Sequence, residues 1–227
     1  MLLCLLTKFF EYFCIMKIYN TEDTICAIST GENQSAVATI RVSGKNAIKI
    51  TNKIFNKDIT NAESHTLHFG CLVSKDEIVD EVLISIFRDH KSFTGEECTE
   101  ISCHGSLYIK NKIIQLLINQ GCRNAIPGEF TMRAFKNGKI DLSQAESVAD
   151  LITSETKAEH QTALQQLRGG FSNKLKELRN NLIDFASLIE LELDFPEEDV
   201  EFANRKQLQK LLNTISKELK MLISSFK

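Results

Sequence analysis

The sequence contains no tryptophan and only two prolines and ten glycines among its 227 residues. So little proline and glycine argues against a disordered or low-complexity chain. The sequence also has no large excess of positive charge. The formal net charge is -3, which by itself does not indicate nucleic-acid binding. Charge that binds RNA would have to lie in a local patch or elsewhere. The hydrophobic share of 43% and the charged share of 25% suit a soluble globular protein of one large or two small domains.

A disulfide signature is absent as well. The seven cysteines are odd in number and scattered, and no C-x-x-C spacing occurs. This favours free thiols in a reducing cytosol. Cys98, Cys103 and His104 lie close together in the sequence, but they belong to a strand-like run and no second pair of ligands follows. We therefore expect buried thiols here and no metal site.

A long uninterrupted apolar run is the third absence. Residues 1–16 are largely apolar, yet Lys8 and Glu11 interrupt them and no small-residue cleavage site follows. The segment is also too short and too charged to span a bilayer. We expect a peripheral extension, with Met1 or Met16 as the start, and no membrane partner. A segment that lies on a membrane surface is the alternative.

Strand-like and helix-like patterns alternate over residues 23–122. Apolar residues near helical spacing predict helices over residues 45–55 and from Ile109 to a cap at Gly121. β-branched and apolar runs predict strands at residues 24–28, 36–42, 66–73, 78–87 and 99–103. Such alternation is typical of an α/β or α+β domain.

The strand pattern ends at Pro127, and a helical region follows it. The first helix of this region has two alternative caps, Ser143 with Glu146 or Asp141 with Gln144. In either pair, the side chain of the first residue accepts from the backbone N–H of the second, and the second side chain accepts from the backbone N–H of the first. The helix is therefore expected to begin between these residues.

Gly169 and Gly170 interrupt the helical region, and apolar residues recur at steps of four and three over residues 171–189. Such a stripe is a helix-packing seam, which suits the core of a bundle as well as a subunit interface. The predicted fold class is α+β. A mixed α/β domain is expected at residues 17–137, and an incomplete all-α helical domain at residues 138–227.

Three blocks of charged turns stand beside apolar runs, at residues 92–97, 127–131 and 139–146. Their sequences are SFTGEE, PGEFT and KIDLSQAE. Taken together and in this order, the blocks resemble the amino-terminal part of the MnmE (TrmE) family, GTPases that modify the wobble uridine of certain tRNAs. The resemblance starts near Asp23 and runs to the end of the chain.

The resemblance implies a folate pocket made by Arg41, Glu100 and Lys139, where the family binds 5-formyltetrahydrofolate and a tetrahydrofolate is the presumed one-carbon donor. A carboxylate such as Glu100 can accept the adjacent amino and ring N–H groups of a pterin, while Arg41 or Lys139 neutralises the glutamate tail. Sequence pattern alone favours an Arg41–Glu100 ion pair at a sheet edge and a solvated Lys139. Arg133 and Glu129 are expected to brace the loop.

A phosphate-binding P-loop, G-x-x-x-x-G-K-[ST], is absent. The only two Gly-Lys pairs, Gly44-Lys45 and Gly138-Lys139, lack the other residues of the motif. We expect no GTP binding and no catalytic residue in this chain. The family holds GTP, Mg²⁺ and K⁺ in a GTPase domain inserted at about the point where this sequence ends. The chain is therefore expected to be a fragment, a truncated product or a protein that has lost that domain.

The resemblance also implies partners and a location. It implies a cytoplasmic homodimer, formed through the amino-terminal domain, that acts on tRNA together with the flavin-dependent protein MnmG. Their joint reaction attaches a carboxymethylaminomethyl-type group to carbon 5 of the uridine. Two alternatives are a stand-alone folate-dependent aminomethyltransferase and a non-catalytic dimerisation module that has lost its ligand.

Overall fold

The computed structural model describes residues 22–194 and 205–225, except Glu32 and Asp76. The peripheral extension predicted for residues 1–16 lies outside the described residues. Among the helices that are described, none has the length and apolar character that a membrane crossing requires.

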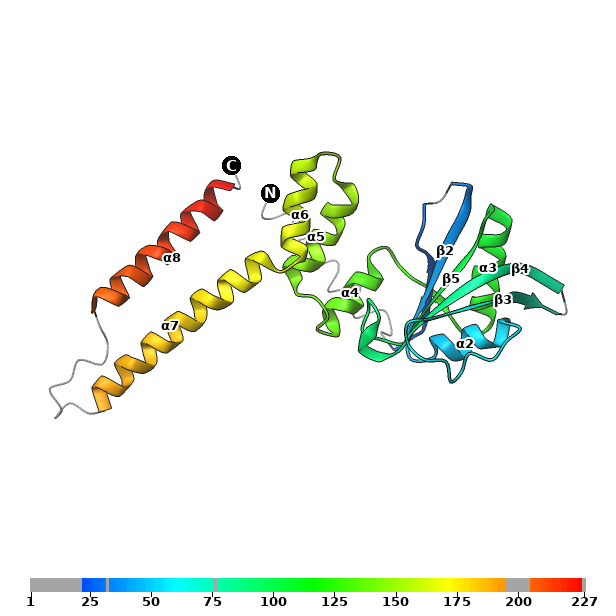
Figure 1. The fold of residues 1–227 in the computed structure, drawn as a ribbon, viewed down its shortest axis with the longest axis horizontal. Coiled ribbons are helices and arrows are strands. Elements are labelled where there is room, and N and C mark those ends of the chain that lie inside the picture. Colours follow the sequence, from blue (N-terminus) through cyan, green and yellow to red (C-terminus); the bar gives the residue numbers. More distant parts are fainter. Residues whose placement is uncertain (1–21, 32, 76, 195–204, 226–227) are drawn as a thin grey trace. The chain divides into compact units, whose positions relative to one another are not determined.

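The chain divides into two compact units between Ala145 and Glu146. The first unit is built on a six-stranded sheet of order β3-β4-β5-β2-β1-β6, shown in Figure 1. Its strands are β1 (Ile25–Ile28), β2 (Ser35–Ser43), β3 (Thr66–Ser74), β4 (Glu77–Phe87), β5 (Cys98–Gly105) and β6 (Arg123–Asn124). Its helices are α2 (Ala47–Ile54), the 3-10 turn η1 (Asp89–Lys91), α3 (Leu107–Asn119) and α4 (Glu129–Lys136). Neighbouring strands are antiparallel except for β1 and β6.

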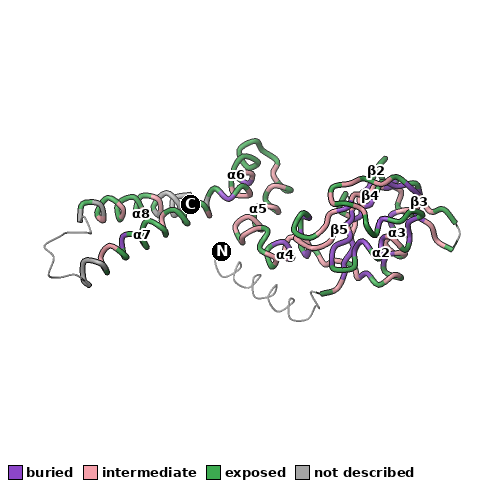
Figure 2. Tube along the Cα trace, turned by 60° about the horizontal axis from the view of Figure 1, so that its bottom comes forward, coloured by how far each residue is buried: buried purple, intermediate pink, exposed green. Residues whose placement is uncertain are grey.

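One face of this sheet holds the hydrophobic core. Ala38, Ile40 and Val42 alternate along β2 and are fully buried, as are matching residues of β4 and β5. Helices α2 and α3 pack on this face and close the core, which Figure 2 shows as the buried stretches of the strands. Burying each valine or isoleucine of this core stabilises the fold by about 1.5–3 kcal/mol. Because side chains alternate along a strand, Thr39 and Arg41 lie on the opposite face.

The opposite face is only partly covered. Near one end of β2, residues of the 92–97 loop and of α4 lie over Arg41. Farther along the sheet, Leu67 and Phe69 of β3 and Leu83 of β4 are exposed, and Phe69 is the register partner of Leu83. The first unit therefore presents an apolar strip beside a polar, charged region.

Each strand predicted between residues 24 and 103 is present. The prediction missed α4, because it treated residues 127–131 as a turn. Two of the three buried residues of α4, Glu129 and Arg133, are charged, so the rule that buried positions are apolar does not find this helix. Gly128, with φ of +78°, occupies its N-cap position in the left-handed conformation that favours glycine.

The second unit is helical, which confirms the predicted α+β class. Its helices are α5 (Leu142–Thr153, whose first residues belong to the first unit), α6 (Lys157–Leu167), α7 (Gly170–Asp194) and α8 (Arg205–Ser225). Of the two caps proposed for α5, Asp141 with Gln144 is present, each side chain bonding the other's amide at 2.9 Å. A capping box of Thr156 and Glu159 starts α6.

The apolar stripe of α7 is partly covered in the described part of this unit. Phe185 is buried, and α7 contacts α8, where Lys174 and Glu218 form an ion pair at 2.6 Å. Leu175 and Leu182 of the same stripe remain exposed. The stripe therefore serves as a local packing seam, and its predicted role as a subunit interface stays a prediction.

Candidate functional site

Arg41 and Glu100 meet at the centre of the sheet. They are register partners on the adjacent strands β2 and β5, and the ladder places both side chains on the face opposite the core. Arg41 Nε donates to Glu100 Oε1 at 2.8 Å, and Nη2 lies 2.7 Å from the same oxygen. The pair is thus real, but it stands between two central strands and not at a sheet edge.

Two aromatic rings flank the guanidinium of Arg41. Its Cζ lies 5.2 Å from the ring centroid of Phe93 and 5.5 Å from that of Phe130. Contacts of this length are attractive cation–π contacts, and they also restrict the rotamers of a long side chain. Phe93 comes from the 92–97 loop and Phe130 from α4, so two of the charged blocks converge on Arg41.

This arrangement leaves one donor and one acceptor unused. Both contacts of Arg41 go to Oε1 of Glu100; Arg41 Nη1 and Glu100 Oε2 have no hydrogen-bond partner among the residues that the structure describes. Both side chains are about one-quarter exposed, at 24% and 28%. The site therefore offers a fixed carboxylate oxygen of Glu100 and, on the side of the guanidinium that faces away from Glu100, an unused N–H donor of Arg41.

Lys139 does not join this pair. Its Nζ donates to the backbone carbonyl of His90, and its aliphatic chain passes over Gly95. A Cβ built on Gly95 would lie 3.0 Å from Lys139 Cγ, and Gly95 has φ of +78°, so this position suits glycine on both counts. The same loop thus carries Phe93, which contacts Arg41, and Gly95, which contacts Lys139.

A buried ionic network holds the 92–97 loop in place. The network is centred on Arg133, which is 1% exposed. Arg133 Nη1 donates to the carbonyl of Asp23 at 2.8 Å and to both carboxylate oxygens of Glu96 at 3.3 Å. Its Nη2 donates to Glu129 Oε1 at 3.0 Å. The bracing role expected for Arg133 and Glu129 is therefore what their contacts provide.

Glu129 is held ionised inside this network. Burial alone would raise its pKa, but hydrogen bonds from Arg123, from the amide of Ile126 and from Arg133 outweigh burial and keep the pKa of Glu129 below its ordinary value. Arg123 closes the network, with Nη2 2.7 Å from Glu129 Oε1 and Nε 3.2 Å from Asp23 Oδ2. This stabilisation is complete above the ordinary glutamate pKa and is lost as the pH falls through the lower folded-state value.

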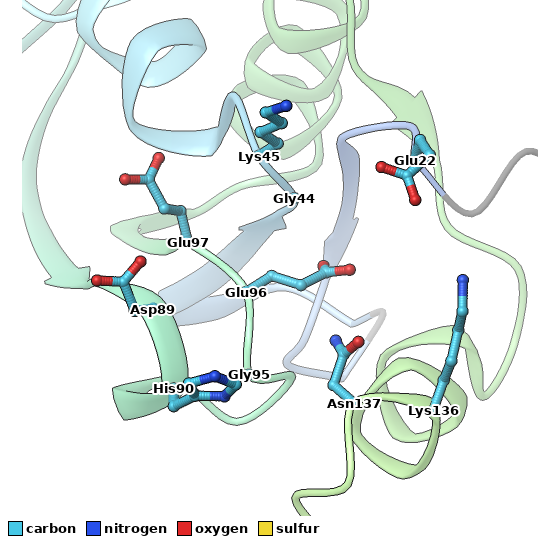
Figure 3. A pocket seen from close by; sticks show the side chains of 10 residues that line it. All are labelled: Glu22, Gly44, Lys45, Asp89, His90, Gly95, Glu96, Glu97, Lys136 and Asn137. Carbon is cyan, nitrogen blue, oxygen red and sulfur yellow. The ribbon is translucent and has the colours of Figure 1, made fainter.

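A polar cavity of about 450 Å³ is lined in part by residues of the 92–97 loop (Figure 3). Asp89, His90 and residues 95–97 form one wall, and Lys136 and Asn137 at the end of α4 form another. The remaining lining residues are Glu22, Gly44 and Lys45. Neither Arg41 nor Glu100 lines it, so the cavity and the Arg41–Glu100 pair are separate features that share a loop.

The thiols near the site are not arranged as metal ligands. Cys98 and Cys103 both belong to β5, and their odd spacing places them on opposite faces of the sheet. Burial raises the pKa of Cys98 to about 12 and that of Cys103 to about 11, so both are thiols at neutral pH. Within the described residues no group of three potential ligands is assembled.

The sequence prediction missed the aromatic residues of the site. Phe93 and Phe130 both fall inside the charged blocks, but nothing local indicates that they flank an arginine from a distant strand. An aromatic residue placed between charged turn residues was the available signal. Glu96, which accepts from Ser43 Oγ at 2.8 Å and from Arg133, lies in the same charged block as Phe93 but was not singled out.

The fold defines a class: a mixed α/β domain followed by a helical domain. Comparison with known protein families identifies the family to which the chain belongs. Residues 24–139 match the family described as "GTP-binding protein TrmE N-terminus", and residues 142–227 match the "MnmE helical domain". The chain belongs to the MnmE (TrmE) family, as its charged blocks predict.

Curated relatives named "tRNA modification GTPase MnmE" agree with this assignment. The chain is 56% identical to that of Flavobacterium johnsoniae over 209 residues and 58% identical to that of Flavobacterium psychrophilum over 208 residues. The Bacteroides thetaiotaomicron relative is 53% identical over 210 residues. Each alignment covers 90% of this chain but 45% of the relative, so the chain spans less than half the length of these relatives.

Proposed function

We propose that this chain is the folate-binding part of an MnmE-type tRNA modification protein. The observation that carries the proposal is the unused Oε2 of Glu100, a carboxylate held in place by Arg41, whose guanidinium is flanked by Phe93 and Phe130. The amino-pyrimidinone ring of a reduced folate presents an amino group beside a ring N–H, and the unused oxygen of Glu100 can accept a hydrogen bond from this edge. The ligand is 5-formyltetrahydrofolate or a related tetrahydrofolate.

Lys139 serves the other end of the ligand in this proposal. Arg41 is committed to Glu100, so it is poorly placed to neutralise the glutamate tail of folate as well. Lys139 is exposed, and its ammonium group is held only by the carbonyl of His90. It can exchange that neutral partner for a carboxylate of the tail with a gain in electrostatic attraction. In this proposal Glu100, held by Arg41, binds the ring end of the folate, and Lys139 binds its glutamate tail.

The wider activity follows from the family. We propose that the complete protein acts in the cytoplasm on the wobble uridine of tRNA with an MnmG-type flavin-dependent partner. GTP, Mg²⁺ and K⁺ would be held by a domain outside these 227 residues. The matches to both MnmE regions favour this function over a stand-alone aminomethyltransferase, because that alternative does not account for the helical match.

Calorimetric titration of the chain with 5-formyltetrahydrofolate and with GTP tests the proposal. We expect saturable heat with the folate, because the ring edge and the tail each find charged partners. We expect none with GTP, because no sequence in the chain wraps a phosphate chain with glycine amides. Saturable GTP binding would contradict the second expectation, and the absence of folate heat at high ligand concentration would contradict the first.

We further propose that the chain is a homodimer through its first unit. The support is the open sheet face, where Leu67, Phe69 and Leu83 leave apolar surface exposed. Sedimentation equilibrium at tens of micromolar is expected to show a dimer that Phe69→Lys weakens, since a lysine in an apolar interface loses its hydration. Leu182→Lys on α7 is the matched control, because it also charges an exposed apolar position. If only Leu182→Lys dissociated the dimer, the helical stripe would be the interface.

A further inference from the structure

We propose that Phe93 is the surface on which the flat ring of the ligand stacks, and that it determines specificity for the ring end. The inference rests on the proposed folate site and adds a binding residue to it. The ring of Phe93 contacts Arg41 and also remains partly exposed to solvent.

The backbone on both sides of Phe93 is fixed. Ser92 and Thr94 are buried, at 3% and 0% exposure. Thr94 Oγ1 lies 2.6 Å from Ser43 Oγ, and the Thr94 carbonyl accepts from Asn137 Nδ2 at 2.7 Å. Phe93 itself is 38% exposed. A rigid loop therefore holds a large apolar ring against solvent, which costs free energy unless a partner covers the ring.

The Phe93 ring lies beside the guanidinium that holds Glu100, the residue to which the ligand ring would bind. Arg41 Cζ is 5.2 Å from the centroid of Phe93, and the unused Nη1 belongs to the same guanidinium. A flat group that donates to Glu100 Oε2 would extend beside the Phe93 ring. Stacking then covers the exposed part of the ring, and the hydrogen bonds set the orientation of the group.

This geometry selects a chemical class. The site suits a planar heterocycle whose edge carries N–H donors, such as the amino-pyrimidinone part of a pterin. It does not suit the flexible glutamate tail, which has no face to stack. Phe93 should therefore contribute to the affinity for any ligand that carries the ring, with or without the tail.

Calorimetry and absorption spectroscopy on the full chain test this. The probes are 5-formyltetrahydrofolate and the tail-free pterin-6-carboxylate, and the variants are Phe93→Leu and Phe93→Tyr. Phe93→Leu keeps an apolar side chain but loses the aromatic face, so we expect about tenfold weaker binding of both probes and loss of the hypochromic change of the ring. Phe93→Tyr should restore both.

Two controls separate the explanations. Phe69→Leu removes an exposed ring elsewhere on the same sheet face and should bind like the wild type. Phe130→Leu removes the other ring beside Arg41 and should weaken binding less while keeping the hypochromic change. Equal losses for Phe93→Leu and Phe130→Leu, or wild-type binding by Phe93→Leu, would overturn the role of Phe93 while the folate site stands. No folate binding by the wild type would overturn the site itself.

Discussion

Replacing Arg133 by methionine is expected to destabilise the first unit by about 3–5 kcal/mol, the cost of removing one partner from a buried ion pair. Methionine fills much of the volume but has no charge. Glu129, which is 1% exposed, would keep Arg123 as a partner but lose the buried donor from Arg133. The carboxylate of Glu96 would keep only the hydroxyl of Ser43 as a partner. The backbone carbonyl of Asp23 would lose its donor.

Arg123→Met is the matched control, because Arg123 pairs with the same carboxylate of Glu129. The side chain of Arg123 is 26% exposed, whereas that of Arg133 is 1% exposed. Water can therefore replace more of the hydrogen bonds that the loss of Arg123 would remove. Native-state hydrogen exchange of the β2 and β5 amides reports on the first unit by itself. If Arg133→Met lowered their protection no more than Arg123→Met does, the network would not be the brace that we infer.

Much of the first unit was predictable because its signals are local. The alternation along β2, with Ala38, Ile40 and Val42 buried, needs only neighbouring residues to be recognised. The same holds for the cap that starts α5 at Asp141. The all-α character of the second unit follows from the loss of alternation after Pro127.

The contacts of the site were not predictable from local pattern. Arg41 and Glu100 are 59 residues apart, and the strand order alone decides that β2 and β5 are neighbours. The resemblance to a family grouped these two residues with Lys139, but it did not show that Arg41 uses its donors on Glu100. Nor did it show that Lys139 rests on the loop through Gly95.

Helix α4 shows a different reason for failure. Its buried residues, Glu129 and Arg133, are charged, and they are stable inside only because Arg123, Glu96 and the chain near Asp23 meet them there. Sequence analysis assigns charged residues to exposed positions. A helix that buries charged residues is therefore easily taken for a turn. The charge that marked residues 127–131 as unusual was the same charge that hid the helix.

Glu100→Gln is expected to weaken binding of 5-formyltetrahydrofolate by about 1.5–3 kcal/mol, roughly 10- to 150-fold. The substitution keeps the shape of the side chain but removes the charge that accepts from the ring N–H. It also turns one of the two terminal atoms into a donor, which would face Arg41 or the ligand. Because the pair is about one-quarter exposed, the fold itself should lose little stability.

The most direct test of the folate site is calorimetric titration of Glu100→Gln beside Glu97→Gln. The two carboxylates are closely matched: each pairs with an arginine, and their side chains are 28% and 29% exposed. Glu97, however, pairs with Arg88 at 3.4 Å and lines the separate cavity. We predict the loss for Glu100→Gln and a change of less than about twofold for Glu97→Gln, whose partner is away from the ring. Equal losses for the two variants, or a larger loss for Glu97→Gln, would contradict the placement of the ligand at Arg41 and Glu100.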